Sequence, residues 1–160
     1  MEVEGFYYFD RQDSIWTSNF SNGTISSVKR YSFGKLKDLV SMYNIRGEKI
    51  KFGNFKNGAG ELVQFFENGI KSSQGNYLDG FPNGEWKYYF ENGGLKAEGK
   101  FAFADKTGIW KYYNAKTGKI KAKGTYSYHE PIGEWQFFDE NGKLTYNTNV
   151  DEETFSLPFD

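Results

Sequence analysis

One stretch decides the fold of this chain: Gly84-Glu85-Trp86-Lys87-Tyr88-Tyr89-Phe90-Glu91-Asn92-Gly93. Closely similar stretches begin at Gly108 and Gly133, and a weaker one begins at Gly60. When these stretches are aligned on the tryptophan, one column recurs at spacings of 23, 23, 24, 24 and 25 residues: Trp16, Leu39, Leu62, Trp86, Trp110 and Trp135. A nearly fixed period over most of a chain indicates stacked structural units.

Each unit is predicted to be a β-hairpin. A turn pair that ends in glycine follows every member of the tryptophan column, and an aliphatic residue follows the turn. Asn-Gly between two apolar runs is typical of a type I′ hairpin turn, in which both central residues have positive φ. The turn pairs are Asn22-Gly23, Arg46-Gly47, Asn68-Gly69, Asn92-Gly93, Thr117-Gly118 and Asn141-Gly142.

The two faces of each strand differ, because side chains alternate along a strand. Trp86 and Tyr88 share one face, and Lys87 and Tyr89 share the other. We expect the tryptophan column to stack on one face as the core, with the two leucines continuing it. A glycine recurs on the return strand, as at Gly99, and we expect it to leave room for an aromatic ring of the neighbouring strand.

The predicted fold is all-β, an elongated single-layer antiparallel meander of about six hairpin repeats. A half-unit occupies residues 1–13, and repeats start near residues 14, 37, 60, 84, 108 and 133 of a domain that spans 1–149. The segment 34–43 has a short helical pattern but lies in register with a repeat strand, so a strand is predicted there. The acidic and apolar tail 150–160 is expected to cap the last hairpin, with a flexible end or a docking peptide as alternatives. A closed barrel is less favoured, because the period varies and the two ends differ.

Composition excludes several classes of protein. Among 160 residues the formal charge is −1, with 20 basic and 21 acidic side chains interspersed, which disfavours a nucleic-acid or polybasic membrane surface. Cysteine is absent, and no apolar run approaches the roughly 20 residues of a spanning helix. The N-terminal residues lack the basic and apolar regions of a signal peptide, so a cytoplasmic location is expected. A signal removed ahead of this sequence would leave the same pattern.

Few side chains suit catalysis. The single histidine, His129, lies in a predicted turn and is expected to be an exposed loop residue. Glu85 and Glu134 occupy one repeat column, so their recurrence favours cross-strand pairing with lysines over glycosidase chemistry. The glycine-rich stretches lack the strand–loop–helix context of a phosphate loop. We therefore expect no enzyme, no cofactor and no metal site.

A second column suggests a binding surface. The residue three positions beyond each tryptophan-column member faces away from that column, and large rings with charged neighbours resemble a protein-binding surface. The alternative, weighed equally, is that these rings only shield a one-layer sheet. The predicted contact residues for a protein partner are Phe65, Tyr89, Tyr113 and Phe138, with Lys87 and Lys111 beside them.

Residues 84–89, 91–96 and 98–101 resemble the MORN-repeat-variant family of bacterial proteins. The resemblance is strongest over residues 60–144 and weaker before them, where Trp16, Leu39 and the Asn22-Gly23 turn remain. It implies an elongated antiparallel sheet of consecutive hairpins, and it brings no catalytic motif. Bacterial members are often described as antitoxins of toxin–antitoxin pairs, so the resemblance also implies an antitoxin or immunity-type role.

The functional expectation is a non-catalytic module that binds a partner protein, such as a cognate toxin, through its aromatic sheet face. The alternative is a structural or scaffolding repeat protein without a toxin partner, for instance at the cell envelope. An enzyme ranks below both. The oligomeric state is left open.

Overall fold

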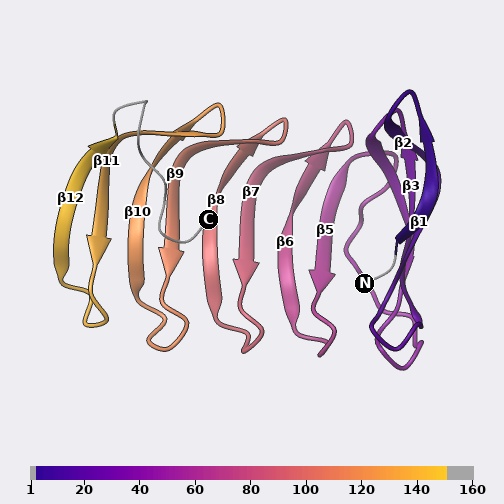
Figure 1. Cartoon of the computed structure of the whole chain (residues 1–160), viewed down its shortest axis with the longest axis horizontal. Helices are drawn as coiled ribbons and strands as arrows, with labels where there is room; N and C mark the ends of the chain where they lie inside the picture. The colour runs from indigo at the N-terminus through magenta and orange to yellow at the C-terminus, as the bar shows by residue number, and fades with distance from the viewer. Residues whose placement is uncertain (1–2, 151–160) are drawn as a thin grey trace.

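A computed structural model describes residues 3–150 and contains twelve strands (Figure 1). Consecutive strands pair antiparallel throughout each sheet. The strands are β1 Val3–Tyr8, β2 Arg11–Asn19, β3 Ile25–Ser32, β4 Lys35–Met42, β5 Gly60–Phe65, β6 Lys71–Leu78, β7 Phe81–Tyr89, β8 Leu95–Ala102, β9 Asp105–Tyr113, β10 Ile120–Ser127, β11 Glu130–Phe138 and β12 Leu144–Val150. The predicted all-β antiparallel meander is confirmed, and so is the strand predicted over residues 34–43.

The meander is divided into two sheets. The first holds β1 to β4 in sequence order, and the second holds β5 to β12. In the view of Figure 1 the eight-stranded sheet is seen face-on, whereas the four-stranded sheet is seen nearly edge-on. The C-terminal tail that we predicted to be a cap lies outside the described residues from position 151 onward.

The break falls at residues 43–59, where the second strand of a hairpin was expected. This segment makes only isolated bridges, among them Gly53 with Leu62. The Asn54 side chain accepts a hydrogen bond from the backbone N–H of Glu61 at 2.7 Å, while the backbone N–H of Asn54 donates to the Glu61 carbonyl at 3.1 Å. A side chain that bonds to the backbone competes with the regular ladder, so the segment leaves the sheet here.

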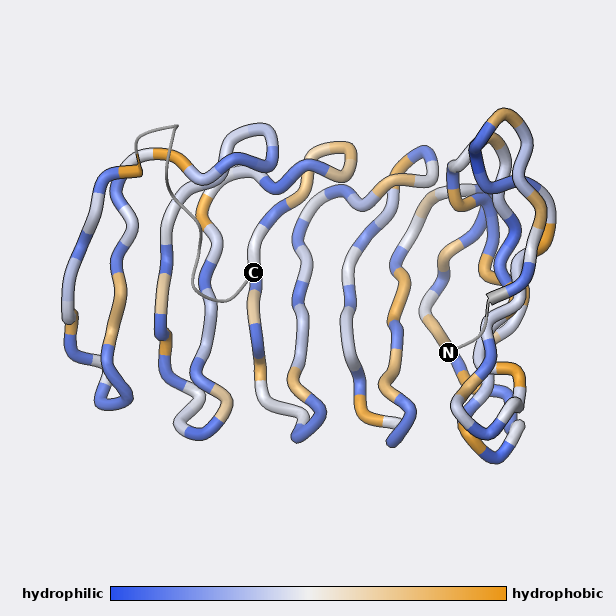
Figure 2. Tube along the Cα trace, in the orientation of Figure 1, coloured by the Kyte–Doolittle hydropathy of each residue, from blue (hydrophilic) through white to orange (hydrophobic). Residues whose placement is uncertain are grey.

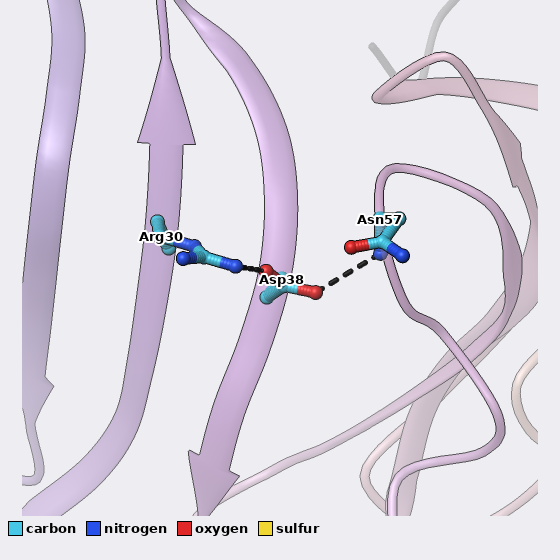
Figure 3. A network of polar contacts seen from close by, with 3 residues as sticks. All are labelled: Arg30, Asp38 and Asn57. Carbon is cyan, nitrogen blue, oxygen red and sulfur yellow. Dashed lines mark hydrogen bonds and ion pairs between the residues drawn. The ribbon is translucent and has the colours of Figure 1, made fainter.

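Polar contacts hold this break to the first sheet (Figure 3). Asp38 of β4 accepts a hydrogen bond from the backbone N–H of Asn57 at 2.9 Å and forms an ion pair with Arg30 of β3. The bond from Asn57, followed by the one from Arg30, lowers the pKa of the Asp38 carboxyl. Lys35 reaches across to the second sheet, where its ammonium lies 2.5 Å from the Asp79 carboxylate.

The Asn-Gly turns do not have the predicted type I′ geometry. In the Asn92-Gly93 turn only the glycine has positive φ, 85°, and Gly93 N–H donates to the Phe90 carbonyl at 2.9 Å. This pattern fits a type I turn followed by a left-handed glycine, not a type I′ turn. The asparagine has a second use, because Asn92 Nδ2 donates to the Ala115 carbonyl of the next turn at 3.1 Å. The type I′ prediction was wrong because it assumed a two-residue loop, whereas the pairing of Phe90 with Gly94 leaves a three-residue loop.

Type I′ geometry occurs instead where one hairpin leads into the next. Five two-residue connections between consecutive strands have positive φ at both positions and lie at the opposite ends of the strands from the Asn-Gly turns (Figure 1). Such turns match the twist of the strands that they join. They are Phe9-Asp10, Phe33-Gly34, Asp79-Gly80, Phe103-Ala104 and Tyr128-His129.

The predicted core column is confirmed. All six members are buried, and Trp110, Trp135 and Leu62 are the largest side chains that are fully enclosed among the described residues. Apolar and polar residues alternate along many of the strands (Figure 2), so one face of a single sheet can collect the apolar side chains. Each large ring hides about 150–250 Å² of surface, which explains how one layer sustains a core.

Glycines on the return strands make the column possible. A Cβ atom at Gly99 would overlap the indole of Trp110, and the same relation links Gly75 to Trp86 and Gly124 to Trp135. The predicted close-approach role of these glycines is therefore confirmed. An aromatic two residues beyond each glycine then meets the indole edge-on. The ring centroids of Phe101 and Trp110, for example, are 5.1 Å apart at 84°.

This aromatic face should make the protein sensitive to alkali. Burial is the largest cause that raises the pKa of Tyr77 and of Tyr88, from 10.0 to about 12 in each case. Below pH 10 both states keep these hydroxyls neutral. As pH rises from 10 to 12 the unfolded chain loses these protons first, so the free energy of unfolding should fall. Denaturant titrations across this range should show a shallower decline for Tyr88→Phe than for the wild type, and equal slopes would contradict the assignment.

Candidate functional site

The face opposite the tryptophan column carries an aromatic row. Tyr89, Tyr113 and Phe138 end strands β7, β9 and β11, and each is half-buried. Strands in a sheet lie about 4.7–4.9 Å apart, so rings on every second strand recur at about 9–10 Å. The sheet therefore presents three rings in a regular row, at the positions that the sequence predicted for them.

Each of these rings already has a partner within the sheet. The ammonium of Lys71 lies 5.4 Å from the ring centroid of Tyr89, and that of Lys123 lies 5.7 Å from Phe138. The Tyr113 hydroxyl donates to the Glu98 carboxylate at 2.7 Å. Burial, followed by this bond, raises the pKa of Tyr113, so the donor stays protonated at ordinary pH. These contacts restrict the rings, and each ring residue remains partly exposed.

A row of charged side chains runs beside the rings. Lys87, Glu98 and Lys111 are direct cross-strand neighbours on β7, β8 and β9. Lys111 lies 3.3 Å from the Glu98 carboxylate, whereas Lys87 is exposed. The bond from Tyr113 is the largest cause that lowers the pKa of Glu98, and the charges of Lys111 and Lys87 add to it. The site thus combines one shared carboxylate with two lysines around Tyr113.

Phe65 ends β5, two strands before Tyr89, and it pairs with Lys71, whose ammonium lies over the Tyr89 ring. It packs with the apolar cluster at the break between the sheets, which includes Leu39 and Leu62. Met42, the equivalent residue one unit earlier, is buried in the same cluster. Phe65 therefore differs from the other rings of the row in its contact with this cluster. The structure places the four predicted rings at the ends of β5, β7, β9 and β11, with Lys87 and Lys111 on β7 and β9.

Sequence reasoning missed a set of exposed aromatic residues in the turns that connect successive hairpins. Phe9, Phe33, Phe103 and Tyr128 open four of the type I′ turns and are between 57% and 85% exposed. Positive φ is uncommon for bulky residues, because Cβ then approaches the neighbouring carbonyl oxygen. The signal in the sequence is their position, since three of them precede a tryptophan by seven residues and Phe33 precedes Leu39 by six.

Among the described residues, the side chains that could serve in metal binding do not gather at one place. His129 is exposed in its turn, as predicted. Within residues 3–150 no group of three or more His, Asp or Glu side chains is placed to hold a metal ion. The same residues contain no helix with the length and apolar character that crossing a membrane requires.

The fold and the two unlike sheet faces define a hairpin-repeat protein whose core column consists of one buried tryptophan or leucine from each unit. Two of these units, residues 82–102 and 131–151, match the family model described as MORN repeat variant. These two units are similar to MORN repeat variants, in agreement with the resemblance in the sequence.

Other comparisons add little. No protein with a curated description matches the chain. Among solved structures, the crystal structure of TarM is similar over 85% of this chain, with 11% sequence identity and a TM-score of 0.34. This chain spans only 20% of the TarM chain. A likeness of that size supports no argument about fold or function.

Proposed function

We propose that this repeat protein is a non-catalytic module that binds a partner protein through the face that carries Tyr89, Tyr113 and Phe138. The observation that supports the proposal most is the regular row of half-buried rings beside Lys87 and Lys111 on a rigid sheet. Tyrosine and phenylalanine are enriched in protein interfaces whereas lysine is depleted there, so the rings support the proposal more than the lysines do.

The geometry favours binding at low entropic cost. Tyrosine has few side-chain torsions, and the bond from Tyr113 to Glu98 already restricts one of these rings. Little further freedom is lost when a partner covers it. The exposed ammonium of Lys87 would mainly affect orientation and the rate of encounter, because rim charges contribute less to affinity than buried anchors do.

The finer proposal is that the partner is a toxin and that the protein acts as an antitoxin or immunity protein. It rests on the family resemblance alone. The competing proposal, a structural or scaffolding repeat, draws on the same contacts: rings that are engaged by Lys71, Lys123 and Glu98 also shield the sheet. The two proposals differ in what happens when the rings are replaced.

The test measures stability and partner affinity together. A partner is first captured from cells that produce the protein, identified by mass spectrometry and purified. The affinity of that purified partner is then compared for the wild type and for Tyr89→Ser, Tyr113→Ser and the double variant. Tyr128→Ser is the matched control, because Tyr128 is an exposed tyrosine at a turn, away from this face.

If the face binds the partner, the double variant should stay folded and lose at least about 2 kcal/mol of binding free energy, the size of a typical hot spot. Tyr128→Ser should then bind normally. Full binding by a folded double variant would remove this face from consideration. Loss of binding with Tyr128→Ser alone would indicate that the partner contacts the turns between hairpins and not this face. Coexpression with the identified partner, scored as rescue of growth, separates an antitoxin from a scaffold.

A further inference from the structure

A cavity of about 350 Å³ opens at the boundary between the two sheets. Residues from β2, β3, β4 and β5 line it, together with residues from the break. Its walls include the apolar side chains of Phe20, Met42 and Ile50 and the hydroxyl groups of Ser18 and Ser27. Pockets for small ligands usually measure about 300–1,000 Å³ and combine apolar walls with a few polar groups, so this cavity is within the range.

Lys29, which lines the cavity, lies where the tryptophan column is interrupted. In the regular units a tryptophan covers the glycine of the preceding strand, as Trp110 covers Gly99. In the first sheet Leu39 stands in the tryptophan position, and its neighbour on β3 in the glycine position is Lys29. The smaller leucine leaves the space into which a lysine side chain fits. A charged group therefore lies on the face that is otherwise the apolar core.

The Lys29 ammonium has no partner. Among residues 3–150, no acceptor forms a hydrogen bond with it and no carboxylate forms an ion pair. Lys29 is half-buried, and this burial lowers the pKa of its ammonium. A carboxylate bound beside the ammonium would favour its charged form. The cavity that Lys29 lines has room for such a carboxylate.

One carboxylate already lies at the rim. Glu67 lines the cavity, but it is exposed and accepts a hydrogen bond from the Ser21 hydroxyl, not from Lys29. The other titratable side chain of the lining is Tyr43. A single ammonium matches one carboxylate, whereas a phosphate dianion needs more donors and would meet Glu67 at the entrance. Because apolar side chains form part of the cavity walls, a ligand that fits should carry an apolar group next to its carboxylate.

We propose that this cavity binds a carboxylate carried on a small apolar group, with Lys29 as the ion-pair partner and Ser18 and Ser27 as hydrogen-bond donors. The acid is either a free arylalkyl carboxylate or the C-terminus of a peptide that ends in an aromatic residue. The lining of this cavity does not include Tyr89 or Tyr113, so the proposal does not depend on whether their face binds a protein.

Isothermal titration calorimetry with matched probes tests the site. The free-acid arm compares 3-phenylpropionate with its uncharged amide, and the peptide arm compares acetyl-Ala-Ala-Phe with its C-terminal amide. The wild type should bind at least one acid about tenfold or more tightly than its amide, as expected for a charge-assisted pair. If the preference appears with 3-phenylpropionate, the ligand is a free acid, and if it appears with the peptide, the ligand is a peptide C-terminus.

The variant Lys29→Met should abolish the preference for acid over amide while its melting temperature stays close to that of the wild type, because Lys29 makes no hydrogen bond or ion pair with the described residues. Lys96→Met, which removes an exposed lysine of β8, is the control and should retain the preference. The proposal is overturned if neither acid binds the wild type, or if Lys29→Met still prefers the acid.

A second readout uses the wild type alone and covers the case in which Lys29→Met does not fold. Acetic anhydride acetylates accessible neutral amines, and mass spectrometry reports the extent at each lysine. The bound acid should reduce acetylation of Lys29 at least about tenfold, in proportion to occupancy, and leave Lys96 unchanged. Equal acetylation of Lys29 with and without saturating acid would also overturn the proposal.

Discussion

Replacing Trp110 by alanine is expected to lower the free energy of unfolding by about 3–5 kcal/mol, the usual cost of removing a large buried ring. Only 1% of this side chain is exposed. Its ring meets those of Phe101 and Tyr126 edge-on, and its indole N–H donates to the Lys100 carbonyl at 3.1 Å. The substitution therefore removes contacts on both sides of β9 at once. Urea denaturation followed by circular dichroism measures the loss.

Tyr113→Ala is the comparison on the same strand. Tyr113 is only half-buried and faces the other side, where its main bond is to Glu98. Its removal should cost clearly less than the removal of Trp110. If Tyr113→Ala proved the more destabilising of the two, the tryptophan face would not be the one that holds the sheet together.

Gly99→Ala is expected to cost about 3 kcal/mol, at the upper end of what overpacking a core usually costs. The added methyl group would overlap the indole of Trp110, which is enclosed and has no free space to enter. Either β8 or the ring must move. Gly94→Ala is the control in the same hairpin, because the nearest atom to a methyl group there is Asn92 Oδ1 at 3.1 Å. The control should lose much less stability.

A double-mutant cycle shows whether the clash is the cause. Trp110→Leu reproduces the leucine that the chain itself has at position 39 opposite Lys29. If the overlap with the indole accounts for the cost, Gly99→Ala combined with Trp110→Leu should be less destabilised than the sum of the single variants, by about 1–3 kcal/mol. Strict additivity would mean that the glycine is required for the backbone of β8 and not for the ring above it.

Much of the fold follows from local pattern. Alternation along each strand assigns Trp86 and Trp110 to one face and Tyr89 and Tyr113 to the other, and the structure agrees. The glycine column was predictable for the same reason, since a recurring glycine beside a recurring large ring indicates close approach. These features depend on neighbours within one hairpin or the next, and a period of 23 to 25 residues makes such neighbours visible in the sequence.

The turns and the site depended on contacts between units. An Asn-Gly pair predicts a turn, but the bond from Asn92 to Ala115 of the following hairpin accompanies a different turn type from the one predicted. Tyr89 and Tyr113 lie where the sequence places them. Phe65 ends β5 in the same row, but it also packs against the apolar cluster at the break, a contact that the local pattern did not indicate.

The amino-acid sequence by itself determined the repeat, the faces of its strands and the tryptophan core, because these follow from side-chain size and alternation over short distances. Only the tertiary structure decided where the meander breaks into two sheets and that Lys29 faces a cavity at that break. The reason is volume. Where a leucine replaces a tryptophan, a neighbouring side chain can fill the remaining space or a cavity can be left. Which of the two occurs depends on how separate strands pack, and a local sequence pattern does not record that packing.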